Sequence, residues 1–123
     1  MRWFARRACL TLLVLSYTPA LAEEAPPPPH IKTQITTVFT GWNDDLFGII
    51  TVDPVVDPAG CNPGPTIHGY AADSTQPNYH TLYAVALLAF AERATVVVVV
   101  DPRKGSCVVD RPKLMGLNIL RDD

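Results

Sequence analysis

Side chains able to carry out acid–base, nucleophilic or metal chemistry are scattered along this 123-residue chain. The three histidines, His30, His68 and His80, have no spacing typical of a metal site. The carboxylates cluster among prolines and glycines in stretches typical of turns, whereas acid–base catalysis needs paired groups held in a cleft. No residue stands in a nucleophile–base pattern. The sequence therefore predicts a protein that is not an enzyme and uses neither a cofactor nor a metal.

The stretch from Gly41 to Asp45 contains a tryptophan and two adjacent carboxylates. Asp44 and Asp45 offer oxygen atoms to a calcium ion or a catalytic pair. Asn and Asp are also typical turn residues, because their side chains bond to nearby amides, and we favour the turn. An indole at the tip of a turn cannot be buried completely. Trp42 is therefore a candidate for stacking on a sugar or for contact with a partner.

His68 and Tyr70 are weaker candidates for orienting a ligand. They are two residues apart in a stretch that predicts a strand, so both side chains fall on one face. A half-buried histidine in a strand is more often structural than ligand-binding. His80 falls in the first turn of a predicted helix, where we expect it to be exposed.

Residues 1–22 have the three parts of a secretory signal peptide. A basic segment, Met1–Arg7, precedes a short apolar core, Ala8–Tyr17, and Ala20-Leu21-Ala22 supplies the small residues that a signal peptidase recognises. We predict cleavage after Ala22 and export to the periplasm or out of the cell. The apolar core is well short of the roughly 20 residues that cross a bilayer, so we predict no membrane span.

Removal of this segment would change the charge and the cysteine count of the chain. It would leave 101 residues, with seven Lys and Arg against twelve Asp and Glu. An acidic chain without a basic run is not expected to bind nucleic acid. Cys9 would leave with the signal peptide. The two remaining cysteines, Cys61 and Cys107, are predicted to form a disulfide in an oxidising compartment.

The rest of the chain divides into a linker, residues 23–30, and one small domain, residues 31–123. The four prolines Pro26–Pro29 favour an extended polyproline II tether. In the domain, Ile31, Thr33, Ile35, Thr37 and Phe39 alternate with polar residues. This alternation predicts a strand that turns back at residues 41–45 into a second strand over residues 46–52, a β-hairpin. We expect a third strand over residues 67–72.

The stretch from Pro77 to Val100 predicts a helix that feeds a strand. Ala, Leu and Glu favour a helix up to Glu92, and Asn78 and Thr81 can cap its first amides. Five valines, Val96–Val100, predict a central strand that is buried on both faces. The last strand is expected over residues 113–120, with Leu114, Gly116, Asn118 and Leu120 on one face.

The predicted helix is apolar on all sides. Tyr79, Tyr83, Ala86 and Phe90 form one stripe, and no charged residue occurs between His80 and Glu92. One face can lie on the sheet, but a domain of this size has no obvious cover for the other. We therefore predict a homo-oligomer that buries the helix. The expected interface residues are Tyr83, Ala84, Leu87, Leu88 and Ala91.

The resulting order is β-β-β-α-β-β, with the helix between the third and fourth strands. It predicts a β-rich α+β domain that resembles a small five-stranded OB-fold barrel. The chain is similar to the small secreted B subunits of AB5-type bacterial toxins, especially those of subtilase cytotoxin and pertussis-like toxins. The segments that carry this resemblance are Phe47–Ile50, Asn78–Tyr83, Ala94–Val98 and Leu114–Ile119, together with one cysteine before the helix and one after the following strand.

The resemblance implies a ring of copies whose helices face the centre, with a carbohydrate site on each barrel and a toxin A-type protein as a partner. The serine with which such subunits bind sialylated glycans has no counterpart that can be aligned here. A second hypothesis therefore stands beside the oligomeric binding module. It is a periplasmic inhibitor or structural protein that acts through a disulfide-braced loop, residues 57–66.

Overall fold

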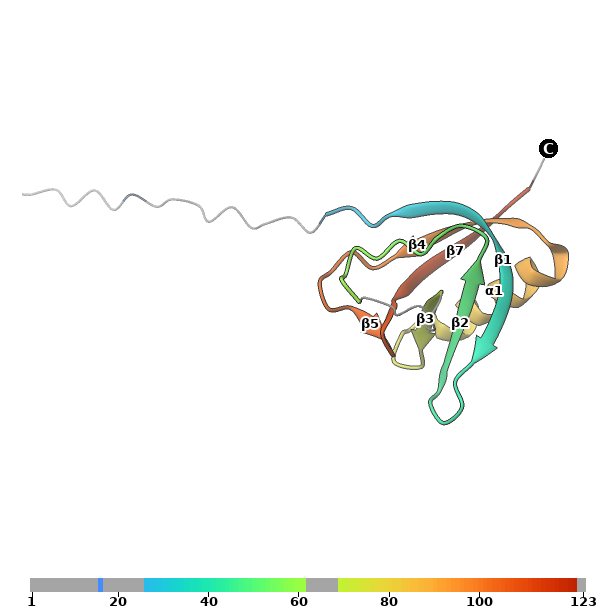
Figure 1. Cartoon of the computed structure of the whole chain (residues 1–123), viewed down its shortest axis with the longest axis horizontal. Coiled ribbons are helices and arrows are strands. Elements are labelled where there is room, and N and C mark those ends of the chain that lie inside the picture. The colour runs from blue at the N-terminus through green and yellow to red at the C-terminus, as the bar shows by residue number, and fades with distance from the viewer. Residues whose placement is uncertain (1–15, 17–25, 62–68, 122–123) are drawn as a thin grey trace, which may run out of the picture.

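The computed structural model describes residue 16 and residues 26–61 and 69–121. It shows a β-rich domain with a five-stranded antiparallel sheet, one helix and a small two-stranded sheet (Figure 1). The predicted signal peptide, apart from Ser16, lies outside the described residues, as do Ile67 and His68. The elements are β1 (His30–Thr40), β2 (Leu46–Thr51), β3 (Tyr70–Asp73), α1 (Tyr79–Glu92), β4 (Thr95–Val100), β5 (Cys107–Val108), β6 (Arg111–Pro112) and β7 (Leu114–Leu120).

β1 lies at the centre of the sheet, whose order is β3-β2-β1-β4-β7. Its first half pairs with β4 and its second half with β2, so the long strand curves around the domain (Figure 1). The predicted hairpin of β1 and β2 is confirmed. The predicted alternation stops at a bulge between Ile35 and Thr37. Beyond this bulge Thr37 is exposed and Val38 packs against the core, because an extra residue changes which side chains face inward.

Across the described residues the five strands form an open antiparallel sheet, which does not close into the predicted barrel. Among the described residues, the backbone pairing between the two edges of this sheet is one parallel bridge, from Ala71 of β3 to Lys113, the residue before β7. Next to this bridge, the side-chain amide of Gln76 donates to the carbonyl of Leu114 at 2.8 Å. Asn78 Nδ2 donates to Met115 O at 3.0 Å, and Asn78 makes no side-chain bond to the helix N-terminus, contrary to its predicted capping role. β3 is only four residues long, which leaves little backbone for a second ladder.

The core lies between the sheet and α1, which packs against β1 and β7. Val96, Val98 and Val100 are fully buried on this side, but Val97 and Val99 on the other side are half-buried. The prediction that β4 is buried on both faces is therefore wrong, because the only helix in the described residues covers one side of the sheet. Phe47 contacts the helix through Tyr79 and Tyr83, with ring centroids 5.5 and 5.1 Å apart.

The predicted inward face of the last strand also needs correction. Leu114 and Leu117 are the buried residues of β7, whereas Asn118 is exposed. The β4–β7 register shifts between Val99 and Val100, which places an extra residue, Met115, on β7. A bulge of this kind changes a two-residue spacing into a three-residue spacing.

The disulfide between Cys61 and Cys107 is confirmed, with an S–S distance of 2.03 Å. It joins the loop after β2 to β5. Arg111 and Pro112 form β6, which pairs with β5. Within the described residues, no helix has the length and apolar character needed to cross a membrane.

Candidate binding groove beside the hairpin tip

A groove of about 330 Å³ lies between the turn that joins β1 to β2 and the turn that joins β5 to β6. One wall comes from the end of β1 and the hairpin turn, and the other from Val109 and Arg111. Trp42, the strongest ligand candidate in the sequence, lines this groove. The other lining residues are Phe39, Thr40, Gly41, Asn43, Asp44 and Leu46.

The hairpin turn is held by its own backbone and by a contact with the helix. The amide of Gly41 donates to Leu46 O at 3.0 Å, and the amide of Leu46 donates to Asp44 O at 2.8 Å. The Tyr79 hydroxyl donates to Asp45 Oδ1 at 3.2 Å, which anchors the turn to α1. Burial and the nearby Asp45 carboxylate raise the pKa of Tyr79, so its hydroxyl keeps its proton at neutral pH. The two aspartates therefore lie in a turn, as we predicted.

Trp42 is held away from the protein at the tip of this turn. Its side chain is 99% exposed, the largest exposure among the large apolar residues described. An indole in water leaves a large apolar surface without cover, and such residues are enriched where proteins bind partners or ligands. The position of Trp42 thus favours contact with another molecule over a role in the core.

Phe39, which lines the groove, packs against Gly48 and Arg111. Phe39 lies opposite Gly48 in the β1–β2 ladder, and a Cβ atom added to Gly48 would be 2.1 Å from Phe39 Cζ. The missing side chain is therefore what lets the ring lie across β2. The guanidinium carbon of Arg111 is 4.7 Å from the centroid of the same ring, a cation–π contact. Arg111 thereby joins the β5–β6 hairpin to the main sheet.

The far wall of the groove has a strained backbone. Val109 and Asp110 form the two-residue loop of the β5–β6 hairpin, with φ values of 47° and 61°. Tight hairpin loops require such positive angles, for which glycine and asparagine are the usual residues. A β-branched residue in this region is rare and costs about 1–3 kcal/mol. In this conformation Val109 is 53% exposed beside the groove.

The disulfide supports this wall. Cys107 belongs to β5, whose partner strand ends one residue before Lys113. The amide of Cys61 donates to Asp57 Oδ1 at 2.8 Å, and the amide of Gly105 donates to Ala59 O at 2.9 Å. A hairpin with two residues in each strand is unstable alone. The loop and the disulfide therefore hold the hairpin that carries Val109 and Arg111.

The groove combines apolar and polar groups in a way that suits a sugar or a protein side chain. Trp42 and Val109 offer apolar surfaces, while Asn43 and Asp44 offer acceptors and Arg111 offers donors. No group of three or more His, Cys, Asp or Glu side chains that could hold a metal occurs in the described residues. The groove therefore presents groups that are chemically able to stack and to form hydrogen bonds.

Tyr70, another of the ligand candidates, does not line this groove. Tyr70 is fully buried, and its hydroxyl accepts a hydrogen bond from the amide of Val56 at 2.9 Å. Burial raises the pKa of this hydroxyl. Its surroundings therefore make it a core residue. His68 lies outside the described residues.

Phe39, Val109 and Arg111 were not among the sequence-predicted site residues. The β5–β6 hairpin is hard to detect because Val109-Asp110 lacks the usual Asn-Gly or Asp-Gly signal. Proline at position 112 also argues against a strand. The only available signal was the pair Val108 and Val109 beside a cysteine, and this is too short to predict a strand.

A second exposed surface lies on the outer side of α1. Leu87 and Leu88 are 42% and 54% exposed, and Ala84 and Ala91 are also exposed. Tyr83, by contrast, is half-buried against Phe47 and belongs to the inner side. No part of the described chain covers the outer face. The sequence pattern predicts an apolar helix face without cover, and the exposure of these residues agrees with it.

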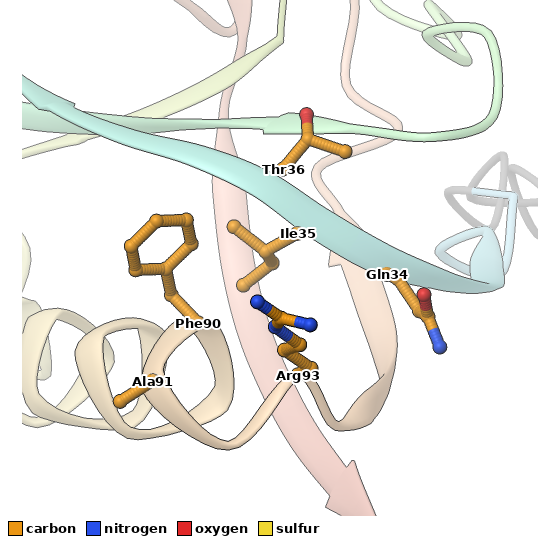
Figure 2. Close-up of a pocket in the computed structure, with 6 residues that line it drawn as sticks. All are labelled: Gln34, Ile35, Thr36, Phe90, Ala91 and Arg93. Atoms are coloured by element: carbon orange, nitrogen blue, oxygen red, sulfur yellow. The ribbon is translucent and has the colours of Figure 1, made fainter.

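A pocket of about 500 Å³ lies between the end of α1 and β1 (Figure 2). Figure 2 shows Phe90 and Arg93 pointing from the helix toward the underside of β1, with Ile35 pointing down toward them. Phe90 is 45% exposed, whereas Tyr79 and Ala86, which belong to the same predicted helix stripe, are buried. The helix ends here because Arg93 adopts a left-handed conformation, with φ of 51°. This pocket extends the apolar surface of the helix to the sheet.

Comparisons of the chain with protein-family models, with curated proteins and with solved structures gave no match.

Proposed function

We propose that this protein is an exported, non-enzymatic binding module whose ligand site is the groove beside Trp42. The observation that carries the proposal is the almost complete exposure of Trp42, 99%, next to the Arg111–Phe39 stack. A sugar is the ligand class that suits the groove best. The apolar face of a sugar ring can stack on the indole while its hydroxyls bond to Asn43, Asp44 and Arg111.

We also propose that the domain is related in architecture to OB-fold B subunits of AB5-type toxins. Support comes from the sheet order β3-β2-β1-β4-β7, from the helix between β3 and β4, and from the bridge between Ala71 and Lys113 where a barrel would close. Turns that bind ligands at one end of such barrels are a known use of this architecture. A toxin A-type partner remains part of this hypothesis.

Oligomerisation through α1 is the second part of the proposed function. The outer face of the helix bears exposed leucines and alanines without a charge between His80 and Glu92. Exposed apolar patches of this kind are typical of protein–protein interfaces. A second copy of the chain would cover the leucines, and a ring of copies would present several grooves at once, which increases avidity for a multivalent glycan.

A glycan array tests the ligand class. We expect the oxidised protein to bind a defined set of glycans, and Trp42→Ala to weaken that binding about fivefold or more, as loss of an aromatic contact would. Val52→Ala is the matched control, since Val52 is also exposed, at 65%, but does not line the groove. An array without signal would count against the sugar, and unchanged binding by Trp42→Ala would refute the site.

The inhibitor hypothesis has one supporting observation. The loop after β2 is tied to β5 by the Cys61–Cys107 disulfide and by the bond from Gly105 to Ala59 O. A loop that is already ordered loses less conformational entropy when it enters a target's cleft. A protein that is monomeric in solution and inhibits a purified hydrolase through this loop would favour this hypothesis over the oligomeric module.

A further inference from the structure

A second pocket with charged walls lies where the end of β4, the start of β7 and the start of α1 meet. Its volume is about 250 Å³, and it shares no lining residue with the Trp42 groove. Arg103 and Lys113 line it, together with Asp101 and Asn78. Four of the ten Lys and Arg residues of the chain fall within residues 103–113, although the whole chain has a net charge of −2. With Asp101 and Asp110 also counted, the connection between β4 and β7 has four basic residues against two acidic ones, so it is net positive.

Asp101 holds the guanidinium of Arg103 in one orientation. The Asp101 carboxylate is fully buried, and it accepts bonds from Arg103 Nε at 3.0 Å and from Arg103 Nη2 at 2.5 Å. The Ser106 hydroxyl donates to the same carboxylate at 2.7 Å. The Arg103 side chain is nevertheless 65% exposed. Its other N–H groups thus face the pocket and the solvent from a position that is already ordered, which lowers the entropy lost when a ligand binds.

Lys113 is held on the other side of the pocket by its backbone. Its carbonyl accepts a bond from the amide of Asp101 at 3.0 Å, and it forms the bridge to Ala71. The amides of Gln76 and Asn78 are bonded to carbonyls of β7, so they stiffen the wall. Across residues 26–61 and 69–121, the ammonium of Lys113 makes no ion pair. It is therefore a cation held near Arg103 with no carboxylate of its own.

We propose that this pocket binds an oxyanion, a carboxylate, sulfate or phosphate group, between Arg103 and Lys113. Guanidinium and ammonium groups are the side chains that bind these anions, through short charge-assisted hydrogen bonds. The charge of the Asp101 carboxylate is partly offset by the hydrogen bonds that it accepts from Arg103 and Ser106. The site is separate from the Trp42 groove and does not depend on a sugar binding there.

Titration of the oxidised protein with sodium acetate, sulfate or phosphate at constant ionic strength tests this proposal. We expect saturable NMR shifts at the backbone amides of Arg103 and Lys113 for at least one anion. The anion that binds most tightly identifies the chemical class of the ligand. Lys113→Met should weaken this binding about tenfold, as loss of a charged hydrogen bond would. Lys113→Arg should restore it. Lys104→Met is the matched control, since Lys104 is exposed on the same connection but does not line the pocket.

Three results would overturn the proposal. One is a set of shifts that grows linearly without saturation. The second is an equal loss of binding in Lys113→Met and Lys104→Met, which would indicate general charge screening. The third is a set of saturable shifts confined to the Trp42 groove. If Lys113→Met does not fold, the titration of the unmodified protein decides, because it requires saturable shifts at Arg103 and Lys113.

Discussion

The guanidinium of Arg111 lies over the ring of Phe39, with its central carbon 4.7 Å from the ring centroid. Arg111 belongs to β6 and Phe39 to β1, so this contact joins the small hairpin to the main sheet. Both residues line the groove. The contact therefore helps to fix the β5–β6 hairpin beside the end of β1.

We expect Arg111→Met to reduce ligand binding in the groove more than it reduces the stability of the fold. The substitution keeps an apolar chain over Phe39 but removes the charge, so the free energy of unfolding should fall by about 0.5–1 kcal/mol. Ligand binding should fall more, because the substitution removes the guanidinium donors of Arg111 from the groove. Urea unfolding and a binding assay measure the two effects. Lys104→Met is the control, and equal effects of both variants would contradict the assigned role of Arg111.

Gly48→Ala should destabilise the protein by about 1–3 kcal/mol, because the new Cβ atom would displace the ring of Phe39. Urea unfolding measures this loss. Gly116→Ala is a matched control on a neighbouring part of the sheet, since its Cβ would meet Val99 at an ordinary distance of 3.4 Å. The double variant Phe39→Ala/Gly48→Ala should show a smaller penalty for Gly48→Ala than the single variant does. Additive penalties would argue against the contact.

Asp101 should give the protein an acid-sensitive stability. The hydrogen bonds from Arg103 hold the pKa of Asp101 far below its ordinary value, although burial alone would raise it. The hydrogen bond from Ser106 lowers the pKa further. An unfolded Asp titrates near pH 4, so the stabilisation is complete above this pH and is lost as the pH falls toward the folded pKa. Thermal unfolding between pH 2 and pH 7 should show this loss.

The matched variants for this prediction are Asp101→Asn and Asp110→Asn. Asp101→Asn should lower stability at pH 7 by about 1–2 kcal/mol, because a charged acceptor is lost, and should flatten the decline in acid. Asp110→Asn, in the exposed β5–β6 turn, should keep the decline of the unmodified protein. The same acid profile in both variants would show that other carboxylates are responsible.

Reduction of the Cys61–Cys107 disulfide should lower the free energy of unfolding by about 4 kcal/mol in the chain-entropy model, given a sequence separation of 46 residues. Urea unfolding with and without a reductant measures this change. The β5–β6 hairpin should loosen first, because the disulfide is its main anchor to the loop after β2. Hydrogen exchange should therefore be faster at Val108 than at Val98 after reduction, and uniform acceleration would contradict this order.

Leu88→Asp should break the proposed oligomer. Leu88 is 54% exposed on the outer face of α1, so the change should leave the folded monomer stable while placing a charge in the interface. Light scattering after a sizing column measures the mass. Val52→Asp is the control, because Val52 is also exposed, at 65%, but does not belong to the helix. A monomeric unmodified protein, or an oligomer that survives Leu88→Asp, would refute the helix interface.

Local patterns in the sequence determined much of the architecture. The alternation after His30 predicted the hairpin of β1 and β2, because side chains in a strand alternate between two faces. The valine run predicted β4, since branched residues favour strands. The two cysteines predicted the disulfide, and the uncharged helix predicted an outer face without cover within the described chain. Each of these features depends on residues close together in the chain or on residue type alone.

Tertiary structure alone decided the groove and the open sheet. The bulges beside Thr36 and Met115 change which side chains face the core, and they arise from the pairing of strands distant in sequence. The β5–β6 hairpin forms although its turn has unfavourable residues, because a disulfide from a distant loop holds it. The packing of Phe39 beside the groove needs Phe39, Gly48 and Arg111 to meet from three strands. No local pattern encodes such a meeting, because it depends on how the whole chain packs.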